Sequence, residues 1–203
     1  ELFTVGKGAG SGYTENDVKA AAKVLTGYSD VADPIGYKFT SGNHDTTNKQ
    51  FSAFYGNKII NGKTGDAGQQ ELDELLDMIF STNEVSKYVC RRLYTFFVYY
   101  EITPEVETNI ITPLAAKFKA SGYSLKTAVE TLISSNHFFD VSIMGSVLKS
   151  PIDFVVGLAR EFEFKFPTGS LADLSNQYKS WENLVNISRA MLQDIGNPPN
   201  VAG

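Results

Sequence analysis

Residues 84–100 have the sequence EVSKYVCRRLYTFFVYY, and this stretch decides the fold class. Apolar side chains recur in it three and four residues apart, the spacing that gathers side chains on one face of an α-helix. The face is formed by Val85, Tyr88, Val89, Leu93, Phe96 and Phe97. The stretch is therefore predicted to be a central helix, with the rest of the chain packed around it.

Six other segments carry helical signals on either side of this stretch. Thr103-Pro104 and Ser150-Pro151 each place a capping residue before a proline, a typical helix start. Thr14 has the acid of a capping box three residues later, and residues 81–83 (Ser-Thr-Asn) are candidates to cap the central helix. A mainly α fold of about seven amphipathic helices is predicted, the other six over about 14–28, 68–80, 104–122, 125–133, 151–164 and 178–191.

The helical period disappears between residues 29 and 66. Pro34 and several glycines divide this segment into short runs, including YKF at 37–39 and KII at 58–60. Such punctuation is typical of turns and short strands. We expect an irregular insertion with room for a small β-hairpin, and a turn at Asn61-Gly62.

Composition limits the classes of protein and partner. A chain of 203 residues with 42% hydrophobic content is long enough for one substantial core, so a single helical domain over residues 1–203 is predicted. The net charge of -5, without a run of basic residues, disfavours nucleic acid as a partner. No apolar run is long enough to span a bilayer. Cys90, the only cysteine, is expected to serve core packing.

Only two histidines are present, and they are the candidate ligand or metal residues. His44-Asp45 lies in the polar insertion, and His137 follows a predicted helix end, three residues before Asp140. Two histidines with either aspartate would make a mononuclear site for a divalent metal. Alternatively, His44 and Asp45 satisfy backbone groups of the insertion, while His137 caps a helix end and packs beside Phe138.

No complete catalytic or cofactor motif occurs, so the sequence leaves open whether the protein is an enzyme and implies no particular cofactor. The glycine-rich segment 6–12 fits neither phosphate-binding spacing and is expected to be a flexible loop.

Several short motifs, in order along the whole chain, resemble a large bacterial family known as domain of unknown function 1800. They are ELFTVG at 1–6, YTENDV at 13–18, LTGY at 25–28, His44-Asp45, RLY and FFV at 92–98, Ser135 with HFF at 137–139, KSP at 149–151 and NPPNVAG at 197–203. Members of that family are longer at both ends, so the chain is expected to be a fragment of a larger family domain. The family's His-Asp pair falls on His44 and Asp45.

The resemblance implies a mainly helical protein, often exported with a cleaved signal and often encoded beside a second, sulfatase-like family. It implies no established activity. Our leading hypothesis is an exported or envelope-associated protein that acts by binding or assembly with another exported protein. The alternative is a metal-assisted hydrolase of an envelope polymer or sulfated glycan, with His44, Asp45 and His137 as its site. A third, purely structural hypothesis is that His44 and Asp45 pin the insertion to the helices.

Overall fold

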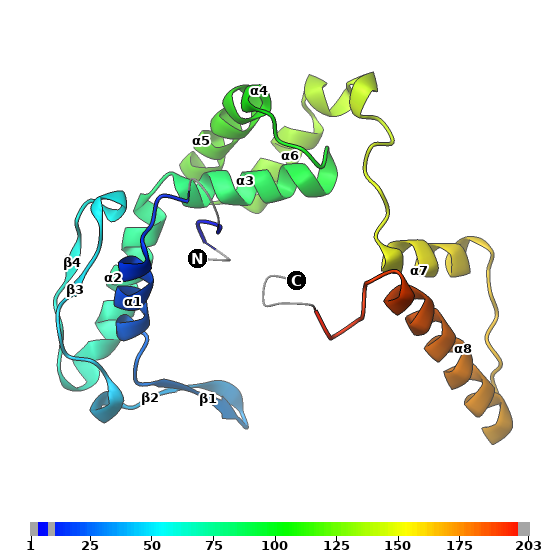
Figure 1. Ribbon diagram of the computed structural model, residues 1–203, viewed down its shortest axis with the longest axis horizontal. Helices are drawn as coiled ribbons and strands as arrows, with labels where there is room; N and C mark the ends of the chain where they lie inside the picture. Colours follow the sequence, from blue (N-terminus) through cyan, green and yellow to red (C-terminus); the bar gives the residue numbers. More distant parts are fainter. Residues whose placement is uncertain (1–3, 8–10, 199–203) are drawn as a thin grey trace. The chain divides into compact units, whose positions relative to one another are not determined.

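A computed structural model describes residues 4–7 and 11–198 and divides the chain into two compact units, Glu1–Ile143 and Met144–Gly203 (Figure 1). The middle of the glycine-rich loop and the end of the NPPNVAG motif lie outside the described residues. The mainly α fold is confirmed, while the single domain stays a prediction. No helix of the described residues has the length and apolar character needed to cross a membrane.

The first unit begins with helix α1 (Glu15–Val24), which is held at its start by a buried carboxylate. Thr14 and Asp17 form the predicted capping box. The Asp17 carboxylate also accepts hydrogen bonds from the Ser52 amide at 2.6 Å and the Ser52 hydroxyl at 2.7 Å. Burial alone would raise the pKa of Asp17, but the bonds from Thr14 and Ser52 outweigh burial and lower the pKa below 3.8. Asp17 thus fastens α1 to a segment 35 residues away.

Asp17 should make the first unit sensitive to acid. Because its folded-state pKa is lowered, its stabilisation is complete above the unfolded-state pKa near 3.8 and is lost as the pH falls through the folded-state value. We expect Asp17→Asn to lower the free energy of unfolding by about 1–3 kcal/mol at neutral pH and to flatten its decline below pH 3.8. Urea unfolding from pH 7 to pH 2 would measure both effects. An equal effect of Asp77→Asn, at an exposed position of the next helix, would contradict this role.

The insertion after α1 contains two small antiparallel pairs. Strands β1 (Tyr28–Ala32) and β2 (Ile35–Phe39) form the hairpin that the sequence predicts, with Tyr28 opposite Phe39. Strands β3 (Lys49–Gln50) and β4 (Ile59–Ile60) form a second pair. Two 3₁₀ segments lie between the strands, η1 (Ser41–Asn43) and η2 (Ala53–Tyr55), and a third, η3 (Gly65–Gln69), follows β4.

The predicted turn at Asn61-Gly62 is wrong, because residues 61–64 form no turn. Gly62 instead lies directly on the backbone of Thr46, where an added Cβ would be 1.9 Å from the Thr46 carbonyl oxygen. Its amide donates to Asn48 Oδ1 at 3.0 Å. A close approach of two backbones, rather than a turn, therefore requires glycine here.

An apolar cluster attaches the insertion to α1 and to helix α2 (Gln70–Ser81). Phe51 and Ile60 come from the insertion and are almost fully buried. They pack with side chains from both helices: Ala20, Val24, Leu75 and Met78. The insertion is thus part of the core of the first unit, and it brings its polar residues against α2.

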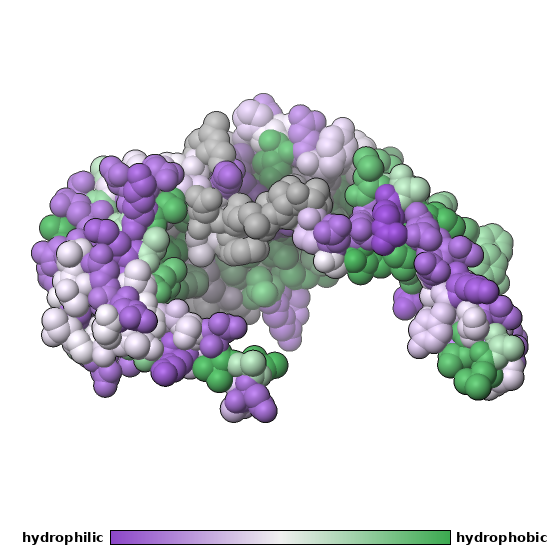
Figure 2. Space-filling view, turned by 60° about the horizontal axis from the view of Figure 1, so that its bottom comes forward, coloured by the Kyte–Doolittle hydropathy of each residue, from purple (hydrophilic) through white to green (hydrophobic). Residues whose placement is uncertain are grey.

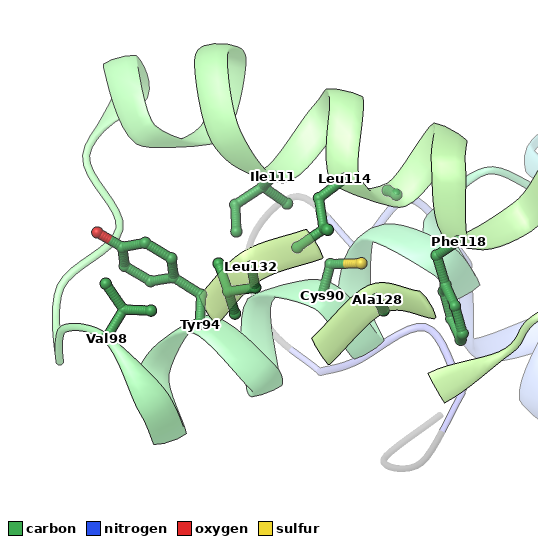
Figure 3. Packing of buried hydrophobic residues seen from close by; sticks show 9 residues of the cluster. Cys90, Tyr94, Val98, Ile111, Leu114, Phe118, Ala128 and Leu132 are labelled. Carbon is green, nitrogen blue, oxygen red and sulfur yellow. The ribbon is translucent and has the colours of Figure 1, made fainter. Parts of the chain in front are cut away.

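Helix α3 (Glu84–Phe97) is the central helix that the sequence predicts, and it carries the second core of this unit (Figure 3). Its most buried side chains are Ser86, Cys90 and Tyr94, which lie four residues apart. The predicted face was wrong at Phe96 and Phe97, which are 71% and 40% exposed. Phe96 lies well away from the line that Cys90 and Tyr94 form, and Phe97 is the last residue of the helix. Burial raises the pKa of the Cys90 thiol to about 12, consistent with packing.

The predicted cap bond at the start of α3 is absent, and a lysine holds the connection before the helix. Asn83 has helical backbone angles and makes no side-chain cap bond. Lys119 Nζ instead donates to the carbonyls of Ser81 at 2.9 Å and Thr82 at 3.1 Å, and to Asn83 Oδ1 at 3.0 Å. The connection between α2 and α3 is therefore fixed from a helix later in the chain, and the two helices meet end to end at an angle (Figure 1).

The core on α3 is completed by one long helical stretch and a shorter helix. The stretch comprises α4 (Pro104–Val106), a π-helical turn (Glu107–Ile111) and α5 (Thr112–Ala120), and is followed by α6 (Leu125–Ile133). Thr103 caps α4 as predicted, and Ser124 caps α6. Ile111, Leu114, Phe118 and Leu132 pack around Cys90 and Tyr94 (Figure 3). Two 3₁₀ segments, Asn136–Phe139 and Val141–Ile143, end the unit.

The second unit is built from helices α7 (Pro151–Glu161) and α8 (Leu171–Ala190), which pack on each other. Ser150 caps α7 as predicted. Helix α8 begins seven residues before the predicted start, at a capping box of Ser170 and Asp173. Of the described residues 144–198, only Val155 and Ser188 are buried. Two helices alone bury little, and apolar residues remain on the surface of this unit (Figure 2, right).

Candidate functional site

His44 follows η1 and is enclosed by the hairpin, by α1's end and by η3. Its side chain is 1% exposed, and its ring lies 5.4 Å from the ring of Phe39. Nδ1 is 2.9 Å from the carbonyl oxygen of Thr26 and therefore carries a hydrogen that it donates. A Cβ added to Gly68 would lie 2.7 Å from His44 Cδ2. The imidazole thus fills a space with no room for one further methyl group on that side.

Glu71, at the start of α2, is the charged partner of His44. His44 Nε2 lies 3.2 Å from Glu71 Oε1, an electrostatic contact rather than an aligned hydrogen bond. The same oxygen accepts from the Lys63 amide at 2.6 Å, and Oε2 accepts from Lys49 Nζ at 2.6 Å. The side chains of Glu71 and Lys49 are both 0% exposed. His44, Lys49 and Glu71 are called the buried clamp below.

The clamp keeps Glu71 ionised despite its burial. Burial by itself would raise the pKa of this carboxyl. The hydrogen bonds from Lys49 and the Lys63 amide, with His44 alongside, outweigh burial and lower the pKa below 4.5. A carboxylate engaged on both oxygens holds three segments of the insertion against α2.

Asp45 directs its carboxylate to its own loop. Oδ1 accepts from the Thr47 amide at 2.8 Å and from the Thr47 hydroxyl at 2.5 Å, and these bonds lower the pKa of Asp45. Its amide donates to Thr26 Oγ1 at 2.8 Å, and its backbone carbonyl accepts from Lys49 Nζ. Asp45 therefore satisfies backbone groups, as the structural hypothesis proposes.

His137 has a separate set of partners, in the core on α3. Its Nε2 lies 2.9 Å from the hydroxyl of Tyr94, and the two rings are stacked with centroids 5.7 Å apart. Asp140, three residues on, accepts from the amide and hydroxyl of Ser142 at 2.9 and 2.7 Å, which lowers the pKa of Asp140. The structure brings His44 and Asp45 together around Thr26 and Lys49, and His137 to Tyr94.

Within residues 4–7 and 11–198, no three His, Cys, Asp or Glu side chains are grouped so that they could hold a metal ion. The metal site of His44, Asp45 and His137, and the hydrolase built on it, stay predictions. Next to His44, hydrogen bonds hold the charged side chains of Lys49 and Glu71 in fixed positions. Such an arrangement is suited to joining segments, because the other polar side-chain atoms of the buried clamp are hydrogen-bonded and only His44 Nε2 is not.

A family model described as a protein of unknown function, DUF1800, matches residues 1–203. The chain belongs to the DUF1800 family. Neither the curated proteins nor the solved structures contain a match to the chain. The family assignment confirms the resemblance seen in the sequence motifs and carries no activity with it, so the function of this DUF1800 chain has to be argued from its own residues.

The sequence did not indicate the partners of the histidine in this DUF1800 chain. Glu71 and Lys49 are separated by 22 residues, and Lys49 lies in a segment without periodicity. A signal for Glu71 was nevertheless present. Glu71, Leu75 and Met78 share the buried face of α2, so a carboxylate stood at an apolar position of the helical pattern. A charge at such a position indicates a buried partner.

Proposed function

We propose that this DUF1800 chain is an exported, envelope-associated protein that works by binding another exported protein. Its export is proposed from the family resemblance. Its binding surface is proposed to be a stripe on α7 that consists of Phe154, Leu158 and Phe162. These residues lie four apart, the first two on one face of the helix and Phe162 directly after its end, and are 50%, 41% and 66% exposed.

The stripe carries the proposal because its side chains stay exposed although they adjoin a buried residue of the same helix. Val155, three residues before Leu158, is buried. The stripe borders a groove of about 440 Å³. An exposed row of large apolar side chains beside a groove favours a protein partner, because such a surface is costly to leave in water.

The charges of the groove favour a partner with acidic residues. Lys149 and Arg160 line it together with the stripe. Neither has an ion pair within the described part of the chain, and Glu161 is the acid beside them. A partner helix with apolar anchors and flanking carboxylates would fill the groove and meet both cations. We therefore propose an acidic amphipathic helix of the partner as the occupant.

The test compares tagged forms of the full chain in the envelope fraction of the organism that encodes it. Wild type should recover one protein at a fixed ratio, with recovery that falls as salt is raised. Leu158→Glu should abolish recovery, whereas Ile35→Glu, at a 95% exposed position in the first unit, should not. Recovery that survives Leu158→Glu would refute the surface. Recovery of monomer alone, or of further copies of the chain, would refute the proposed partner.

A further inference from the structure

A pocket of about 240 Å³ lies between the long helical stretch and α6 in the first unit. Its apolar lining comes from Ile110, Leu114 and Leu132. Leu114 and Leu132 are also part of the core on α3, so the floor of the pocket is anchored in packed structure (Figure 3). A fixed apolar floor is the usual basis of a small-molecule site.

The π-helical turn gives a physical reason for a gap at this place. Glu107–Ile111 is wound more loosely than an α-helix. Pro113, which lines the pocket, has no N–H to donate to the carbonyl of Asn109 four residues earlier. The backbone accommodates the proline with a wider turn, and single π-turns of this kind are frequent at functional sites.

Two polar side chains of the pocket are available to bind a ligand. Lys117 and Asn109 line it, and neither side chain has an ion pair or hydrogen bond to another described residue. By contrast, the ammonium group of Lys119, two residues further along, donates hydrogen bonds to three oxygen atoms of the α2–α3 connection. Lys117 thus supplies a positive charge, and Asn109 an amide donor, beside an apolar floor.

We propose that this pocket binds a small carboxylate with a short aliphatic chain. The chain lies over Leu114 and Leu132, and the carboxylate accepts hydrogen bonds from Lys117 and Asn109. The volume corresponds to about eight water molecules, which limits the ligand to a short acid rather than a full-length lipid. The proposal is independent of the binding surface on α7, because every lining residue belongs to the first unit.

The experiment is a titration of the full chain with hexanoate, followed through the methyl NMR signals of Ile110, Leu114 and Leu132. Saturable shifts confined to these methyl groups are expected. Hexanol should bind about fivefold more weakly, the effect of one partly solvated charged contact. Lys117→Gln should weaken hexanoate binding to the level of hexanol. Lys126→Gln, which removes an exposed lysine of α6 that is absent from the pocket lining, should leave binding unchanged.

Three results would overturn the proposal. The first is the absence of saturation with hexanoate. The second is equal binding of hexanoate and hexanol by wild type, which would leave only an apolar cavity without selection for an acid. The third is an equal loss of affinity in Lys117→Gln and Lys126→Gln, which would show a general effect of net charge. Unchanged amide spectra of both variants would establish that the fold is intact.

Discussion

Replacing Glu71 by alanine is expected to lower the free energy of unfolding of the first unit by about 3–5 kcal/mol. The reason is the ammonium group of Lys49, whose side chain is 0% exposed and whose carboxylate partner at 2.6 Å would be lost. An unpaired charge in the interior is far more costly than the pair was stabilising. Urea unfolding followed by circular dichroism would measure the loss in the free energy of unfolding. Amide hydrogen exchange of peptides from residues 44–71 would show where in the chain the loss occurs.

Two further variants separate the buried charge from the loss of an ordinary ion pair. Lys49→Met combined with Glu71→Gln removes both charges while leaving an acceptor for the Lys63 amide, and most of the stability should return. Glu130→Ala removes the exposed pair with Lys126, whose side chains are 82% and 63% exposed, and should cost less than about 1 kcal/mol. A loss in Glu71→Ala no larger than in Glu130→Ala would refute the buried clamp.

The helices of this chain could be predicted because their signals are local. Capping residues such as Thr14 and Ser150 form bonds three residues away, so the pattern and the structure agree there. The connection into α3 differs because the group that holds it, Lys119, comes from 36 residues further along the chain. Nothing in the residues adjoining Asn83 could indicate a lysine so distant.

At the candidate site, too, local signals could be predicted from the sequence, whereas contacts between distant residues were missed. His44 stood out as one of only two histidines, and Asp45 stood out because it follows His44 in a polar segment. Their role depends on Glu71 and on the space left by Gly68, which reach them only through the tertiary fold. Sequence patterns predict periodicity and caps well, but the pairing of buried charges is set by which segments the core brings together.

The second large loss of stability is expected when Gly62 is replaced by alanine. This change tests how the insertion packs against α2. An alanine Cβ at this position would lie 1.9 Å from the carbonyl oxygen and 2.5 Å from the carbonyl carbon of Thr46. Backbone atoms on both sides would have to move apart. The next residue, Lys63, donates its amide to Glu71, so the displacement would also disturb the buried clamp. We expect Gly62→Ala to cost about 3 kcal/mol or more.

The control is Gly42→Ala in the same insertion, where an added Cβ meets nothing within 4 Å. Gly42→Ala should be close to neutral, since the position has room for a methyl group and lies outside the left-handed region of the backbone. Urea unfolding would compare the two, and amide exchange at Lys63 would report on the clamp directly. Equal stabilities would mean that residues 46 and 62 are not held in close contact.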